Sequence, residues 1–155
     1  MPQLAIGDTA PDFDLPSGNG QNIKLSDHKG HPVVVFFYPK DDTPGCTKEA
    51  ISFTQTNEDF KDAGAVVMGV SKDPVAKHVK FAAKHDLGIP LLSDENSDMC
   101  ERYGVWVEKN MYGRKYMGIE RATYLIGADG LVAQIWRKVK VPGHVEAVLD
   151  AVKAL

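Results

Sequence analysis

The chain has 155 residues, of which 43% are hydrophobic and 25% are charged, and its formal net charge is −3. This length fits one domain, spanning 1–155, with a single substantial core. The weakly acidic balance leaves no basic surface for nucleic acid, and no apolar stretch approaches the ~20 residues that cross a bilayer. Two cysteines are too few for a disulfide scaffold, and the N-terminus lacks the pattern of a signal peptide, so we expect a cytoplasmic protein without nucleic-acid or membrane partners.

Strand-like and helix-like segments alternate along the chain. Continuous apolar, β-branched runs are typical of central strands, whereas apolar residues spaced by about 3.6 indicate helices. The expected strands are 33–38, 65–71, a short run that opens "LLSDENSDMCERYG", and the two arms of the hairpin "RATYLIGADGLVAQIWR". The expected helices are Cys46 to Lys61, ended by Gly64; 74–86, with Pro74 in its first turn; a short one ending at Gly104; and 145–155. This order predicts an α/β sandwich around a mixed sheet.

The stretch "YPKDDTPGCTKEA" joins the first strand to the first helix and carries a cysteine. A cysteine at a helix N-terminus has its pKa lowered by unpaired backbone N–H groups and the helix dipole, and the thiolate is the nucleophile. Pro39 and Pro44 stiffen the loop, and Gly45 lets the backbone approach a small substrate closely. Thr43 lies three residues before Cys46, near enough to bond to the thiolate or to an attacked oxygen. The pattern predicts a reactive thiolate at Cys46.

These residues resemble a known family. Pro39-x-x-x-Thr43-x-x-Cys46 is similar to the active-site signature of the peroxiredoxins, and "FYPKDDTPGCTKEA" resembles the bacterioferritin comigratory protein (peroxiredoxin Q) branch. The segments "GDTAPDFDLP", "LLSDE", "YGVW" and "GIERATYLIGADG" extend the likeness over nearly the whole chain. The resemblance implies a thioredoxin-like fold, in which a central mixed β-sheet is flanked by helices. It also implies thiol peroxidase activity on hydrogen peroxide or organic hydroperoxides, and it places Arg121 on a strand as the active-site arginine.

The implied reaction needs neither a metal nor an organic cofactor. The Cys46 thiolate attacks a peroxide oxygen and becomes a sulfenic acid, while Arg121 holds the sulfur ionised and stabilises the leaving oxygen. Thr43 and the backbone N–H of Cys46 align the peroxide, and Thr43 could also cap the helix, a role that does not exclude the first. The expected substrate pocket consists of Tyr38, Pro39, Pro44, Gly45 and Glu49, where Glu49 supports Arg121 and Tyr38 either lines the pocket or merely ends the strand.

The fate of the sulfenic acid depends on a second thiol. Many members of the branch carry a cysteine five positions after the first, which is Ile51 here, and others carry one in the next helix, where this chain has none. We expect Cys100 to be a small buried hydrophobic residue, so that an external thiol such as thioredoxin, glutaredoxin or a small thiol reduces Cys46. The alternatives are a two-cysteine cycle in which Cys100 resolves, and a non-enzymatic redox sensor or holdase. The resemblance favours a monomer over a dimer.

The remaining polar residues give weaker signals. Position 49 is Glu, so the C-x-x-C of a thiol-disulfide oxidoreductase is missing. His78 and His85 could share a helix face and are expected to be solvated, and the five histidines show no metal-ligand spacing. The acidic stretch 93–98 is expected to form a helix N-terminus. Residues 105–118 are expected to be a loop that controls the preference for one peroxide over another.

Overall fold

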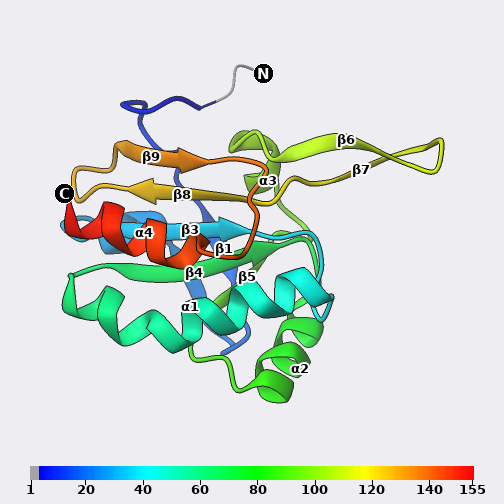
Figure 1. Ribbon diagram of the computed structural model, residues 1–155, viewed down its shortest axis with the longest axis horizontal. Helices are drawn as coiled ribbons and strands as arrows, with labels where there is room; N and C mark the ends of the chain where they lie inside the picture. The colour runs from blue at the N-terminus through cyan, green and yellow to red at the C-terminus, as the bar shows by residue number, and fades with distance from the viewer. Residues whose placement is uncertain (1–3) are drawn as a thin grey trace.

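A five-stranded mixed sheet forms the centre of the computed structural model, which describes residues 4–155 (Figure 1). Its strands run in the spatial order β5 (Leu91–Ser93), β4 (Val66–Ser71), β3 (Val33–Phe37), β8 (Ala122–Ile126) and β9 (Val132–Trp136). β3 pairs in parallel with β4 and antiparallel with β8, and β9 continues the antiparallel part. The sheet confirms the predicted mixed arrangement, in which the 121–137 hairpin supplies the antiparallel strands.

β3 separates two hydrophobic core clusters, because successive side chains of a strand point to opposite faces of the sheet. Val33, Val35 and Phe37 belong to one cluster, whereas Val34 and Phe36 belong to the other. All five are buried, as the unbroken apolar run predicts. The second face is covered by α1 (Pro44–Asp62), α2 (Val75–His85) and α4 (His144–Lys153). The first is covered by the N-terminal segment and by α3 (Met99–Arg102).

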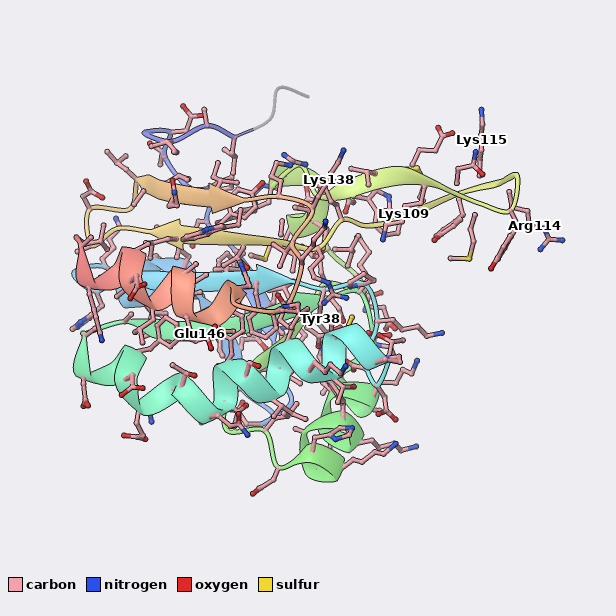
Figure 2. The ribbon with its side chains drawn as sticks, viewed as in Figure 1. Tyr38, Lys109, Arg114, Lys115, Lys138 and Glu146 are labelled. Atoms are coloured by element: carbon pink, nitrogen blue, oxygen red, sulfur yellow. The ribbon has the colours of Figure 1, made fainter. Side chains whose placement is uncertain are left out.

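Two small antiparallel pairs were not predicted. β1 (Asp14–Pro16) pairs with β2 (Asn22–Lys24), which a short 3-10 helix (Leu25–His28) follows. β6 (Trp106–Met111) pairs with β7 (Arg114–Ile119), so the expectation of a loop over 105–118 was wrong. This hairpin projects from the body of the molecule, and Arg114 and Lys115 lie near its far end (Figures 1 and 2).

The helix boundaries differ from the expected ones by one or two residues. α1 begins at Pro44, two residues before the predicted start, because proline suits the first helical position. Pro74 precedes α2 as its N-cap and does not lie in its first turn. Gly64 follows the last residues of α1 with a φ of 84°, which confirms its predicted role in ending that helix. Within residues 4–155, no helix is long and apolar enough to cross a membrane.

Candidate active site

The N-terminus of α1 presents Cys46 as its third residue. Thr43 occupies the N-cap position with an extended backbone, and its side chain makes no hydrogen bond to the helix. Its hydroxyl donates instead to the carbonyl oxygen of Lys40 at 2.8 Å, so Thr43 is not the side-chain cap considered from the sequence. The first N–H groups of a helix have no partner within it. The N–H groups of Gly45 and Cys46 are of this kind, and they add to the positive end of the helix dipole.

Arg121 lies next to the sulfur, although the two residues are far apart in the sequence. It directly precedes β8, so the expectation that it lies on the strand was wrong by one residue. Its Nη2 donates to Cys46 Sγ at 3.2 Å, and its Nη1 donates to Glu49 Oε1 at 2.8 Å. Burial lowers the pKa of Arg121, but Glu49 and Cys46 outweigh burial and raise it above the usual value. The guanidinium therefore stays charged beside Cys46, a residue that is only 1% exposed.

Glu49 is fully buried one helical turn after Cys46. Its Oε1 accepts from Arg121, whereas its Oε2 has no hydrogen-bond partner among the described residues. Burial raises the pKa of Glu49 to about 7, against the opposing effect of Arg121. Glu49 fixes the orientation of the guanidinium.

Gly45 is where the backbone of α1 comes closest to Arg121. A Cβ atom at this position would lie 3.0 Å from Arg121 Nη2, which is tighter than nine in ten real Cβ contacts. The glycine therefore permits a close approach, as expected, but the group that approaches is the arginine side chain.

Of the other predicted pocket residues, Pro39 is half-buried and Pro44 is exposed. Tyr38 is fully buried in the core cluster that contains Cys46. Its Oη donates to Asp41 Oδ1 at 2.6 Å, and burial together with Asp41 raises its pKa well above the ordinary value. The hydroxyl of Tyr38 is thus neutral and donates its hydrogen bond to Asp41.

The expectation of a solvated side chain was wrong for His78, which is fully buried. Its Nδ1 lies 2.6 Å from Asp41 Oδ2, and its Nε2 lies 2.9 Å from the carbonyl oxygen of Leu92. His85 is partly buried and hydrogen-bonds to Asp42 at 2.9 Å. Sequence reasoning missed Asp41 and His78, and the only signal was the position of His78 three residues before the buried Phe81 on the same helix.

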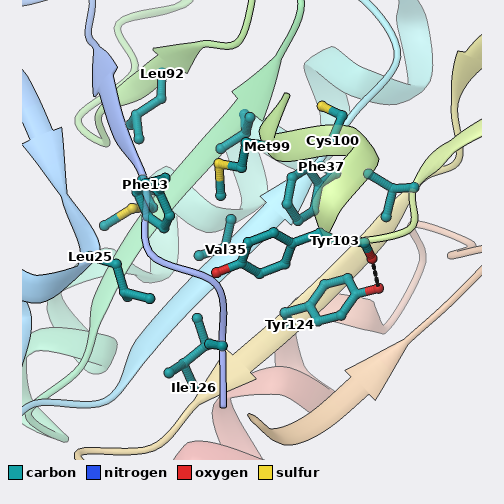
Figure 3. Close-up of a cluster of buried hydrophobic side chains, with 14 of the residues drawn as sticks. Phe13, Leu25, Val35, Phe37, Leu92, Met99, Cys100, Tyr103, Tyr124 and Ile126 are labelled. Carbon is teal, nitrogen blue, oxygen red and sulfur yellow. Dashed lines mark hydrogen bonds between the residues drawn. The ribbon is translucent and has the colours of Figure 1, made fainter. Parts of the chain in front are cut away.

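Cys100 lies in the other core cluster, which also contains Met99, Phe37 and Tyr103 (Figure 3). Cys46 belongs to the cluster on the opposite face of β3, and both thiols are free. A disulfide needs Cα atoms within ~7 Å of each other, and these two cysteines belong to clusters on opposite faces of the sheet.

Asp94 hydrogen-bonds to the start of α3 and affects the pKa of Cys100. Its carboxylate accepts the backbone N–H groups of Met99 and Cys100 at 3.1 and 2.8 Å, which bears out the expected acidic helix N-terminus. Burial, assisted by Asp94, raises the pKa of the Cys100 thiol far above its ordinary value. Cys100 therefore remains a protonated, buried thiol. Across residues 4–155, no group of three or more His, Cys, Asp or Glu side chains is placed to hold a metal ion.

Comparisons with known proteins agree with this geometry. The AhpC/TSA family profile matches residues 6–135. A putative peroxiredoxin bcp from Coxiella burnetii is 49% identical over 146 residues, covering 94% of this chain and 97% of that protein. Peroxiredoxin Bcp from Bacillus subtilis is 47% identical over 150 residues, covering 97% and 96% respectively. A solved structure of the Xanthomonas campestris bacterioferritin comigratory protein, described for its alkyl peroxide reduction activity, has a TM-score of 0.89 and 45% sequence identity. The match covers 97% of this chain and 96% of that chain.

The fold and the site together define a thiol-dependent peroxidase with a thioredoxin-like fold, as the sequence resemblance implied. The chain belongs to the AhpC/TSA family of peroxiredoxins, in its Bcp/peroxiredoxin Q branch.

Proposed function

We propose that this peroxidase reduces hydrogen peroxide and alkyl hydroperoxides at Cys46, and that an external thiol completes a one-cysteine cycle. The observation that carries the proposal is the 3.2 Å contact between Arg121 Nη2 and Cys46 Sγ, in which the arginine is itself held by buried Glu49. A fixed positive charge beside the sulfur favours the thiolate and the charge that develops on the leaving oxygen.

In the first half-reaction, the Cys46 thiolate attacks one oxygen of the hydroperoxide, and the O–O bond breaks. The sulfur gains that oxygen as a sulfenic acid, and the other oxygen leaves as an alkoxide or hydroxide, which takes up a proton. Because the Thr43 hydroxyl donates to Lys40, its lone pairs are free to accept the hydrogen of the peroxide O–H group. The N–H groups of Gly45 and Cys46 supply donors for the oxygens, so the peroxide is aligned from two sides.

The alkyl part of the substrate has space next to the site. A cavity of about 570 Å³ borders α1 and has Gly45 on its wall. Apolar side chains from Ile51, Val141 and Pro142 line it, together with the polar side chains of Lys48, Ser52 and Glu146. An alkyl group loses unfavourable contact with water when it enters such a cavity. The alkyl peroxide reduction of the Xanthomonas relative supports the same substrate class.

In the second half-reaction, an external thiol attacks the sulfenic sulfur, forming a mixed disulfide and releasing water, and a second thiol then regenerates Cys46. The location of Cys100 on the opposite face of the sheet supports an external thiol over an internal one. Thioredoxin, glutaredoxin and glutathione are the reductants to compare.

Peroxide consumption by wild type, Cys46→Ser and Cys100→Ser tests the cycle with each reductant. We expect Cys46→Ser to be inactive and Cys100→Ser to turn over at the wild-type rate. Mass spectrometry of the peroxide-treated protein should show a sulfenic acid or an adduct with the added thiol at Cys46. An intramolecular Cys46–Cys100 disulfide would overturn the one-cysteine cycle while leaving the peroxidase itself intact.

Substitution of Arg121 tests the role of the guanidinium. Arg121→Ala should lower the second-order rate with peroxide by roughly 10²–10³-fold, the loss typical of one preorganised donor, and leave the fold intact. Arg121→Lys should recover little of that rate, because one ammonium does not reproduce the planar fork that contacts both Sγ and Glu49. Stopped-flow rates equal to wild type would refute the role.

A further inference from the structure

The helix α2 holds two consecutive aspartates of the loop that leads to the active-site cysteine. His78 bonds to Asp41 at 2.6 Å, as described above. The next aspartate, Asp42, accepts from Lys84 Nζ at 2.8 Å and from His85 Nε2 at 2.9 Å. Three side chains of one helix thus hold two neighbouring residues of the loop between β3 and α1, and the mechanism above uses none of these contacts.

The buried pair of Asp41 and His78 must share a proton. The Leu92 carbonyl oxygen can only accept, so His78 Nε2 carries a hydrogen. The 2.6 Å contact between His78 Nδ1 and Asp41 Oδ2 also requires a hydrogen between the two atoms, whichever atom holds it. The pair is therefore neutral as a whole. With the hydroxyl of Tyr38 on Oδ1, both carboxyl oxygens of Asp41 are satisfied inside the core.

The loop transmits this restraint to Thr43. The Thr43 hydroxyl closes a turn by donating to Lys40, and the two aspartates lie inside that turn. Asp42 has a φ of 61°, in the left-handed region that residues other than glycine rarely adopt, and its contacts with Lys84 and His85 hold it there. The backbone N–H of Asp41 is fixed as well, because it donates to Asp73 Oδ2 at 2.8 Å.

We propose that His78 is a positioning residue for peroxide reduction: through Asp41 it fixes the turn that presents Thr43 to the peroxide. The proposal rests on the role of Thr43 given above. It concerns the first half-reaction only, because the second needs the sulfenic sulfur and an incoming thiol but not the aligned peroxide.

Two substitutions separate the bonds that His78 makes. The amide nitrogen of His78→Asn can occupy the position of Nδ1 and donate to Asp41, whereas that of His78→Gln can occupy the position of Nε2 and donate to Leu92 alone. We expect His78→Gln to slow sulfenic acid formation by at least ~10-fold, since small displacements of a positioned group are costly. His78→Asn should stay within about 3-fold of wild type. Reduction of preformed sulfenic acid by thiol should be equal in all three proteins.

Rapid-mixing measurement of each half-reaction, well below the melting temperature of each variant, provides the test. Lys80→Ala, an exposed change on the same helix, should match wild type in both half-reactions. In a Thr43→Val background, His78→Gln should cost nothing further, because its effect acts through Thr43. Equal rates for the Asn and Gln variants, or equal losses in both half-reactions, would overturn the proposal in favour of a purely structural histidine.

If Thr43→Val alone left the rate unchanged, the role of Thr43 in the proposed function would fail, and this proposal with it. If Thr43→Val were slow but His78→Gln were fast, only the inference about His78 would fail.

Discussion

Replacing Glu49 by glutamine should remove a large pH dependence of stability. Burial raises the pKa of Glu49 from 4.5 to about 7, so the folded state binds this proton more tightly than the unfolded state does. At about 1.36 kcal/mol per unit of pKa, this difference amounts to about 3 kcal/mol. The contribution is fully present below pH 4.5, where both states are protonated, and it is lost as the pH rises through 7 and the buried carboxylate ionises. Glutamine has the same shape and cannot ionise.

Urea denaturation of both proteins between pH 4.5 and 8, under reducing conditions, measures the effect. We expect the free energy of unfolding of wild type to fall by about 3 kcal/mol relative to Glu49→Gln over this range, because all other groups titrate in both proteins. Glu146→Gln, a change at an exposed residue of α4 (Figure 2), serves as the matched control and should run parallel to wild type. Parallel profiles for wild type and Glu49→Gln would refute the assignment of a buried, proton-binding carboxylate.

Three further substitutions test other contacts. Gly45→Ala places a methyl group 3.0 Å from Arg121 Nη2 and should displace the guanidinium. We expect the stopped-flow rate with peroxide to fall by roughly 10-fold or more. An unchanged rate would mean that the arginine has room to move. Tyr112 has a left-handed φ of 53° and is 99% exposed, and asparagine tolerates this conformation better than tyrosine does. Tyr112→Asn should therefore raise the free energy of unfolding in urea by roughly 0.5–1 kcal/mol without changing activity. A loss of stability would contradict the turn geometry. Asp94→Asn weakens the hydrogen bonds that Asp94 accepts from two backbone N–H groups of α3, and it removes an ion pair with Lys72. The free energy of unfolding should fall by about 1–3 kcal/mol, and the melting temperature should fall with it. An unaltered melting temperature would contradict this role of Asp94.

The central part of the fold could be predicted because its signals are strong. The largely apolar runs of β3 and β4 are typical of buried strands, and the spacing of Ala50, Phe53 and Phe60 is typical of a helix with one apolar face. The β6–β7 hairpin was missed because its exposed strands carry charges at several positions, and its turn uses Tyr112 where asparagine would be the usual signal.

The site could be predicted only in part. The position of Cys46 follows from local sequence alone, since a loop and a helix start are enough to expose a thiol to the helix dipole. The pairing of Arg121 with this sulfur depends on β8 lying beside β3, which the sequence indicates only through the family resemblance. The pairing of His78 with Asp41 was missed because the two residues lie 37 positions apart and both residue types are usually solvated, so the helical spacing of His78 from Phe81 was too weak a signal.

The β6–β7 hairpin forms a sheet of its own and shares no strand pairing with the central sheet. Such a unit can open and close while the rest of the molecule stays intact, so its amide hydrogens should exchange with solvent ahead of those of β3 and β8. Its tip would then accept an inserted tag or dye without loosening the helix that carries the reactive sulfur. The projecting hairpin is therefore the site at which this protein could be immobilised, labelled or extended by an insertion.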